Sequence, residues 1–471
     1  MSPERVGFAL LLLGVMLYAG KWLRLHWRPA QALFLPGSIL AGFLGLLVGP
    51  HVLGAVAAVG EGAFAQGPVP PWIYQVWGTL PGLLINVVFA TLLMGVPLPA
   101  PRRVWGLAGP QLAFGLSLGA GQYVVGILLV ALVLAPFFDI PLMAGALIEI
   151  GFEGGHGTAA GVQAVFDDLG YPAGGELAVG MATVGVVAGI VTGIVLVNWG
   201  ARSGRAVCLD GRAASVSHGQ RRGVIEDHEA PRTLGSMTVR PESMEPLTLH
   251  LAMIALAILI GVGLLEALSW LERLTWARDG GPVLLGAVPL FPMAMLGGVA
   301  VQALLGRLGL ANLLDRETML RLQGLSLDVL IAAAIASLSL PVIADNLVPF
   351  AVLAAGGILW CLFLFLWAAP RMIPDYWFER GIGDFGQSMG VTATGLILMK
   401  IADPENRSPA YEAFGYKQLI FEPFFGGGLI TGISVPLIYN FGPWPLFGAM
   451  VALLALGLAS GLLYFGRNKA A

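Results

Sequence analysis

The segment that decides the fold reads PLMAGALIEIGFEGGHGTAAGVQAVFDD and spans residues 141–168. It is apolar and long enough for a helix that enters a membrane and returns, but Gly154 to Gly157 interrupt it near its middle. A helix from Pro141 to Glu153 would be about 18 Å long, which reaches the middle of a bilayer whose apolar core is about 30 Å thick. We therefore expect a re-entrant hairpin whose tip lies at the membrane midplane. Non-helical backbone is tolerated at that depth only beside protein or a water-filled cavity.

A second segment has the same design and reads PDYWFERGIGDFGQSMGVTATGLILMKIA at residues 374–402. Glycine and polar residues break it between Gly386 and Gly395. We expect a second re-entrant hairpin here.

The whole chain has the composition of an all-α integral membrane protein. It has 471 residues, of which 57% are hydrophobic and 11% charged, and its mean hydropathy is +0.82. Globular proteins carry about 25% charged residues. The first span has no clear cleavage pattern after it, so we expect it to remain in the protein. Full spans are predicted near residues 6–22, 32–50, 77–97, 108–136, 177–199, 247–268, 283–304, 325–341, 347–369, 416–438 and 443–466.

Composition and motifs also exclude several function classes. A net charge of −3 gives no basic excess for nucleic acid, and Cys208 and Cys361 are too few for a disulfide framework or a thiolate metal site. No second His or Cys stands at metal-ligand spacing from His156, so no transition-metal site is expected. The chain has no phosphate-binding loop of the Gly-x-x-x-x-Gly-Lys type. It also lacks a nucleophile and base pair. We therefore expect neither an enzyme nor a bound cofactor, but transport driven by a gradient.

The distribution of basic residues predicts the orientation, because short cytoplasmic loops collect Lys and Arg. With these spans, 22 of the 25 basic residues fall on one side, and the split is still 15 to 3 without the long loop at 201–246. This count places Arg316, Arg380 and Lys417 in the cytoplasmic group. We expect a multi-pass protein of the inner (plasma) membrane, with its N-terminus outside and with its C-terminus and the 201–246 linker in the cytoplasm.

The two halves of the chain resemble each other, which predicts an inverted repeat. Residues 34–42 are echoed by 290–298, Ile85 with 90–92 by Ile331 with 336–338, 158–161 by 392–395, and 192–194 by 431–433. Five full spans precede the second copy, and an odd number gives the copies opposite orientations. We expect a first repeat at 1–200, a second at 247–440 and an additional C-terminal span at 443–466. Inverted repeats with discontinuous helices are typical of secondary transporters.

The two hairpin tips form the predicted binding site for a small anionic solute. The free N–H groups and the dipole at the start of a returning half-helix favour an anion, and Thr158 can cap the first of these half-helices. The alternative is that the glycines only permit close helix packing. The residues predicted to bind substrate are Gly155, His156, Gly157, Thr158, Ala159, Gln387, Ser388, Gly390, Thr392 and Thr394.

Charged residues inside apolar segments predict an ion path, because each is costly in lipid. Glu149, Glu153, Asp384 and Glu422 are such residues, and Glu153 and Asp384 adjoin the breaks. The predicted ligands of a coupling Na⁺ are Glu153, Asp384, Thr158 and Thr392. A buried structural partner for each acid is the alternative. His156 is equally compatible with substrate or proton binding and with a neutral ring that orients the loop.

Three stretches resemble the bacterial sodium/glutamate symporter family. They are Gly154-Gly155-His156-Gly157-Thr158-Ala159-Ala160, Phe166-Asp167-Asp168-Leu169-Gly170-Tyr171, and Leu35-Pro36 with Leu40-Ala41-Gly42. The resemblance implies two inverted five-span repeats with re-entrant loops, sodium-coupled uptake of glutamate, a homodimer and an elevator movement. By position, it places the family's substrate and ion region on 153–160 and 387–394. The second tip matches loosely, the central loop is long and the last span is additional.

The leading hypothesis is a sodium-coupled symporter for glutamate or a similar small carboxylate. The first alternative is a proton-coupled carrier or a cation/proton antiporter, in which His156, Glu153 and Asp384 titrate. A channel with the tips as its filter is disfavoured, because paired inverted hairpins without a charged ring do not resemble a symmetric filter.

Overall fold

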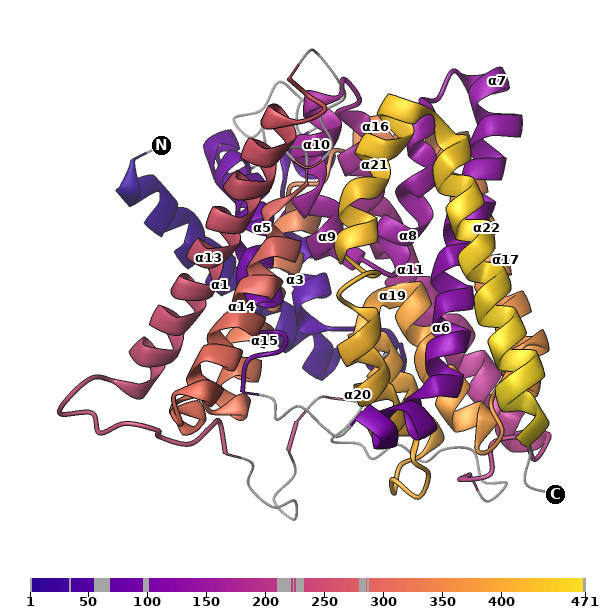
Figure 1. Ribbon diagram of the computed structural model, residues 1–471. Helices are drawn as coiled ribbons and strands as arrows, with labels where there is room; N and C mark the ends of the chain where they lie inside the picture. The colour runs from indigo at the N-terminus through magenta and orange to yellow at the C-terminus, as the bar shows by residue number, and fades with distance from the viewer. Residues whose placement is uncertain are drawn as a thin grey trace.

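The computed structural model describes residues 2–33, 35–54, 68–95, 101–209, 222, 224–225, 233–278, 285 and 288–468. Every regular element in these ranges is a helix (Figure 1). Ten of the described helices are long and apolar enough to cross a membrane, which confirms an all-α, multi-pass membrane protein. Much of the predicted 201–246 linker lies outside the described residues.

The helices of the first half are α1 (Pro3–His26), α2 (Arg28–Ala32), α3 (Gly37–Leu47), η1 (Pro50–Gly54), α5 (Pro71–Thr91), α6 (Pro101–Leu129), η2 (Val130–Leu134), α7 (Ala135–Phe138), η3 (Leu142–Ala146), α8 (Leu147–Phe152), α9 (Gly155–Gly161), α10 (Gln163–Asp168) and α11 (Ala173–Arg202). Those of the second half are α13 (Pro246–Leu274), α14 (Leu290–Arg307), η4 (Ala311–Leu313), α15 (Arg316–Ala336), α16 (Leu340–Asp345), α17 (Leu347–Trp367), α18 (Ala369–Met372), α19 (Trp377–Ala402), α20 (Ala410–Phe421), α21 (Leu429–Phe441), α22 (Pro443–Ala459), η5 (Ser460–Phe465) and η6 (Gly466–Asn468).

One group of helices, here called the six-helix bundle, consists of α1, α3, α5, α13, α14 and α15 (Figure 1). Small residues let these helices approach closely, as is common between membrane helices. Gly42 of α3 packs against Ile335 of α15, and Gly298 of α14 packs against the carbonyl of Ala90 in α5. The Trp77 indole N–H donates a 2.9 Å hydrogen bond from α5 to a carbonyl of α1.

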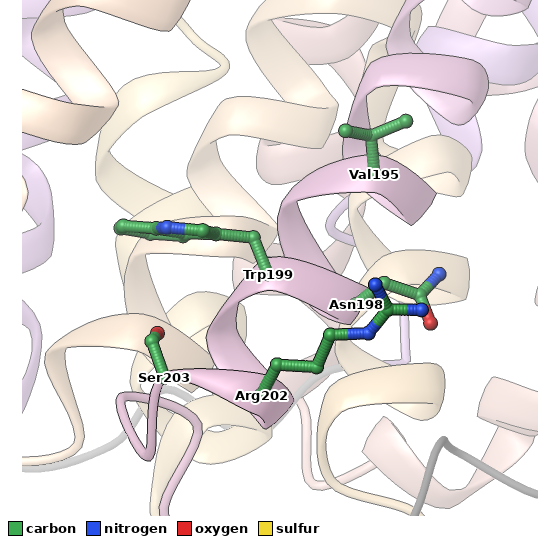
Figure 2. Close-up of a pocket in the computed structure, with 5 residues that line it drawn as sticks. All are labelled: Val195, Asn198, Trp199, Arg202 and Ser203. Carbon is green, nitrogen blue, oxygen red and sulfur yellow. The ribbon is translucent and has the colours of Figure 1, made fainter.

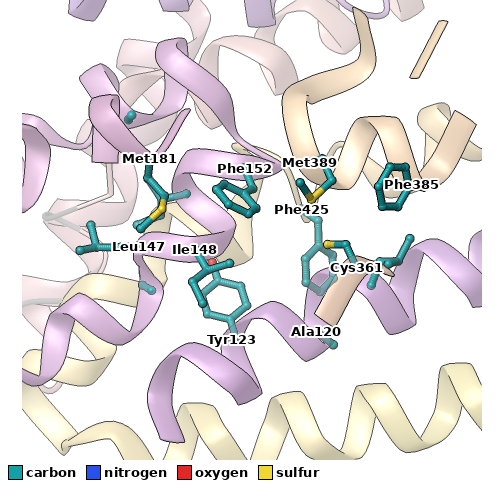
Figure 3. Close-up of a cluster of buried hydrophobic side chains, with 14 of the residues drawn as sticks. Ala120, Tyr123, Leu147, Ile148, Phe152, Met181, Cys361, Phe385, Met389 and Phe425 are labelled. Atoms are coloured by element: carbon teal, nitrogen blue, oxygen red, sulfur yellow. The ribbon is translucent and has the colours of Figure 1, made fainter. Parts of the chain in front are cut away.

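The second group, here called the hairpin bundle, contains α6, α8 to α11, α17 and α19 to α22. Its interior is an apolar cluster that includes Phe152, Met181, Met389 and Phe425 (Figure 3). These side chains surround the segments that the sequence predicts to be hairpin tips.

The predicted span at 416–438 is wrong as a continuous helix. Helix α20 ends at Phe421, and α21 begins at Leu429. Pro423 lies in the segment between these two helices and disfavours continuation of α20. In the same segment Gly426 and Gly427 adopt φ values of +67° and +106°, which a continuing right-handed helix excludes. The second half therefore contains a further helix break beside the predicted site.

Candidate functional site

The first broken helix packs along the N-terminal half of α11. Gly151, just before the break, packs against Met181, and Phe166, well after it, packs against Gly174. The chain therefore runs along α11 towards its middle and then returns towards its start.

The second broken helix packs along α11 from the opposite end. Phe378, before the break in α19, packs against Gly200, and Leu398, after it, packs against Gly193. Within α19, the backbones of Gly386 and Gly395 are in contact, so its two halves fold back on each other. The two breaks thus approach the middle of α11 from opposite ends.

The breaks meet in direct contact. Gly155 has a φ of +70°, and a Cβ on it would lie only 2.2 Å from the Cγ1 atom of Val391. In α19 the helical dihedrals fail at Gly390 and Val391, and Val391 has a φ of 61° and a ψ of 171°. This backbone region is essentially restricted to glycine and is costly for a β-branched residue. At Gly155 the positive φ has little steric cost, because glycine has no Cβ.

The predicted capping role of Thr158 is wrong. Helix α9 begins at Gly155, and no side chain caps its first turn. Thr158 therefore lies inside the helix, where its buried hydroxyl has no hydrogen-bond partner. Helix α9 begins four residues earlier than a cap at Thr158 predicts, with Gly154 and not Thr158 at the N-cap position.

A cavity of about 440 Å³ lies between the two bundles at these tips. The six-helix bundle contributes an apolar wall together with Arg316 and Gln323 of α15. The hairpin bundle contributes Glu153, Gly154, His156, Gly157, Gln387, Gly390, Val391, Thr392, Ala393, Thr394, Gln418 and Glu422.

The cavity separates the predicted substrate residues into two groups. His156, Gly157, Gln387, Gly390, Thr392 and Thr394 line it. Gly155, Thr158, Ala159 and Ser388 are buried behind this wall.

A second hollow lies at the C-terminal end of α11 and is lined by residues of that helix and by Ser203, which follows it (Figure 2). It contains neither tip, and the guanidinium of Arg205 covers the ring of Trp199 at 4.6 Å. We therefore assign the site to the cavity between the bundles.

Lys417 is the main residue of this region that the sequence analysis misplaced. Counted there as a cytoplasmic residue, it is fully buried on α20. Its ammonium donates a 2.5 Å hydrogen bond to the Oε1 atom of Gln387 and lies 3.5 Å from a carboxylate oxygen of Asp384. Arg380 is likewise buried and is not a loop residue, since it donates hydrogen bonds to Asp375 and to the carbonyl of Leu107.

Helix α6 leaves room for this polar cluster through two glycines one turn apart. A Cβ on Gly115 would lie 2.5 Å from Cε of Lys417, and a Cβ on Gly119 would lie 2.8 Å from Oε2 of Glu153. The spacing of Gly115 and Gly119 is the feature of the sequence that could have indicated large buried side chains packed against this face of α6.

Glu153 joins the first tip to the second. Its Oε1 atom accepts a 3.1 Å hydrogen bond from the hydroxyl of Ser388, whereas its buried Oε2 atom has no hydrogen-bond partner. Gln122 of α6 donates to the Ser388 carbonyl at 2.5 Å, and its own Oε1 atom is buried without a partner. Buried polar atoms are normally satisfied, so these oxygens are candidate ligands for a cation or a proton.

Thr392, another of the predicted ion ligands, is hydrogen-bonded to residues of α20 and the turn after it. Its hydroxyl donates a 2.7 Å hydrogen bond to Glu422, which also accepts from the amide of Gln418 at 2.7 Å. All three residues line the cavity. Thr392 therefore already has Glu422 and Gln418 as hydrogen-bond partners.

Two other titratable groups have structural partners. The Glu149 carboxylate accepts hydrogen bonds from Tyr123 at 2.6 Å, Thr431 at 2.8 Å and the Gly426 N–H at 2.9 Å. His156 lines the cavity, and its Nε2 atom lies 3.0 Å from the hydroxyl of Thr183. For Glu149, the alternative of a structural partner fits the geometry.

Comparison of the chain with models of known protein families and with curated protein sequences finds no match. Among the described residues, no three His, Cys, Asp or Glu side chains gather as metal ligands. The tips, the cavity and the buried charges are therefore the features from which a function can be inferred.

Proposed function

We propose that this protein is a secondary active transporter that carries glutamate or a similar small carboxylate into the cell together with sodium. The observation that carries the proposal is the contact between Gly155 and Val391, where two helix breaks from opposite ends of α11 meet beside a cavity. Helix ends that converge inside a membrane offer N–H groups to an anion and carbonyls to a cation.

The packing of the six-helix bundle supports an inverted repeat. The sequence pairs Gly42 with Gly298 and the helix at Ile331 with the helix at Ile85. Gly42 packs on the end of α15, and its counterpart Gly298 packs on the matching end of α5. Contacts of equivalent residues in the two halves are what a two-fold related repeat requires.

The cavity supports a division of labour between the bundles. The six-helix bundle presents mostly apolar side chains, while the tips present Gln387, Thr392 and Thr394. We propose that substrate binds at the tips and that the hairpin bundle moves against the six-helix bundle in an elevator manner. A homodimer would anchor the six-helix bundle in the membrane.

The buried acids support coupling to a cation. Glu153 and Gln122 each have a buried side-chain oxygen without a hydrogen-bond partner, and both side chains bond to Ser388, so we propose that a monovalent cation binds here. A proton on Glu153 would also neutralise its charge, and this makes a proton-coupled carrier the second candidate.

The test is uptake of radiolabelled glutamate into proteoliposomes under an inward sodium gradient, an inward proton gradient or no gradient. We expect uptake with sodium alone, and we expect Thr394→Val to raise KM several-fold. The control is Thr79→Val, because the hydroxyl of this exposed α5 residue bonds only within its own helix. Uptake driven by protons alone would select the second candidate. No uptake of glutamate or competing carboxylates by folded protein under any gradient would refute carboxylate transport.

A further inference from the structure

The ammonium of Lys417 occupies a closed position inside the hairpin bundle. Besides Gln387 and Asp384, it faces the ring of Phe421 at 3.8 Å and that of Phe414 at 5.7 Å. Lys417 is fully buried and does not line the cavity. A buried ammonium is stable only when it is paired and hydrogen-bonded, and these neighbours meet that requirement.

The charges around this ammonium do not balance. Asp384 and Glu153 face it from α19 and the first tip, and both are buried. Arg380 adjoins Asp384 but pairs with Asp375. Glu149 and Glu422 accept hydrogen bonds from neutral donors, and among the described contacts neither forms an ion pair with the ammonium. Helix α6 faces the cluster with Gly115 and Gly119 and with two neutral amides, Gln111 beside Arg380 and Asp384 and Gln122 beside Ser388. The inner cluster of Glu153, Asp384 and Lys417 therefore has two acids and one fixed cation.

Asp384 and Glu153 are in different situations, although the sequence suggests the same role for both. Neither carboxylate oxygen of Asp384 has a hydrogen-bond partner, but the Lys417 ammonium lies 3.5 Å from one of them as an ion pair. Glu153 has only the Ser388 hydroxyl, on one of its two oxygens. A mobile cation at Asp384 would meet the positive charge of Lys417, whereas one at Glu153 would complete the neutralisation of the cluster.

We propose that Lys417 is a resident cation that takes the place of one coupling ion at Asp384, so that the transporter binds a single mobile Na⁺, at Glu153. The inference rests on the proposed function for the identity of the mobile ion. The two acids then have different roles. Asp384 pairs with the fixed ammonium of Lys417, and Glu153 binds the Na⁺ that is exchanged during transport.

The experiment measures the number of ²²Na⁺ ions bound per chain in purified protein in lipid nanodiscs, without substrate. Ionic strength is held constant with choline. We expect one ion for the native chain, two for Lys417→Met and one for Asp384→Asn/Lys417→Met. The added ion in Lys417→Met arises because Asp384 then lacks its fixed partner.

If Lys417→Met does not fold, the Na⁺ affinity of Asp384→Asn can be compared with that of the native chain and of the double variant. Asp384→Asn leaves the ammonium without its carboxylate, so the affinity for Na⁺ at Glu153 should fall by about tenfold or more, and the double variant should restore it. Equal affinity in Asp384→Asn and in the double variant would overturn the proposal, as would one ion in folded Lys417→Met.

The outcomes separate this inference from the proposed function. If the native chain binds no Na⁺ but Lys417→Met gains an ion that Asp384→Asn removes, Lys417 is a resident cation and sodium coupling is refuted. If the native chain and Lys417→Met each bind one ion, sodium coupling stands and the role of Lys417 is refuted.

Discussion

The contact between the tips can be tested by adding one methyl group to Gly155. In Gly155→Ala the new Cβ would lie 2.2 Å from Cγ1 of Val391, while the other Val391 atoms would be 3.6 Å or more away. The variant has two costs. A positive φ costs an L-residue about 1–2 kcal/mol, and the overlap costs about 1–3 kcal/mol as overpacking. We expect Gly155→Ala to lower the free energy of unfolding by about 2–5 kcal/mol, the sum of these terms.

Gly170 provides a matched control, because it has a φ of +80° and no atom within 4 Å of an added Cβ. Gly170→Ala therefore has only the backbone cost. The partner variant is Val391→Ala, which removes Cγ1. In that background Gly155→Ala should cost no more than Gly170→Ala, so the double-mutant cycle gives a coupling of about 1–3 kcal/mol. Unfolding by sodium dodecyl sulfate in mixed micelles measures these differences. If Gly155→Ala costs the same with and without Val391→Ala, the tips do not touch and the site is wrong.

Two further predictions concern groups around the site. Glu149→Gln should lower the free energy of unfolding by about 1–3 kcal/mol, because an amide N–H₂ must replace an oxygen that accepts hydrogen bonds. The Na⁺ dependence of uptake by this variant should be unchanged. A changed Na⁺ dependence would assign Glu149 to the ion path. In the loop after α19, burial opposes the charged form of Asp403, but hydrogen bonds from Ser408 and Arg407 outweigh it and hold the pKa below its ordinary value of 3.8. A carboxyl whose pKa is lowered by folding stabilises the folded protein when the pH is above the ordinary pKa. This stabilisation is lost as the pH falls through the pKa of the folded protein. Asp403→Asn should therefore unfold at a lower temperature than the native chain at pH 7, and this difference in unfolding temperature should disappear below about pH 3.8. The control is Glu405→Gln, since the Glu405 carboxylate is 78% exposed. A difference that does not depend on pH would refute the lowered pKa of Asp403.

The broken helices could be predicted because their signals are local. A run of glycines inside an apolar segment interrupts a helix wherever the segment lies, and both breaks fall within the predicted tips, at Gly155 and at Gly390 with Val391. The packing of both breaks against α11 was not predicted, because it depends on contacts between segments far apart in the chain. Val391 itself could not be predicted, since nothing in a valine's sequence context indicates a positive φ.

Lys417 could not be placed from its own sequence context. It lies at the edge of a predicted span, where a lysine usually reaches the membrane surface. Its burial depends on Asp384, which lies 33 positions earlier in the chain, and on the space left by Gly115 of α6. The unpredicted break after Phe421 also contributed to this error. A single helix at 416–438 would place Lys417 at a membrane boundary, whereas the observed α20 ends at Phe421.

The distribution of contacts determines which parts can move together in the proposed elevator. Gly185 and Gly189 of α11 pack on the carbonyl and the side chain of Met389, so α11 must move with the second tip. Lys417, Asp384 and Glu153 all belong to the hairpin bundle, and movement of that bundle as a unit leaves their buried interactions intact. The contact of α11 with the six-helix bundle is mainly apolar, because Val186 and Ile190 meet Ile39 and Ile335 in a small cluster. One polar contact lies just beyond the end of α15, where the Ser339 N–H donates to Glu176. Apolar side chains can exchange neighbours without leaving a polar group unsatisfied, whereas separating a buried ion pair is strongly unfavourable. The boundary between the bundles, where the cavity lies, is therefore the surface along which sliding costs least.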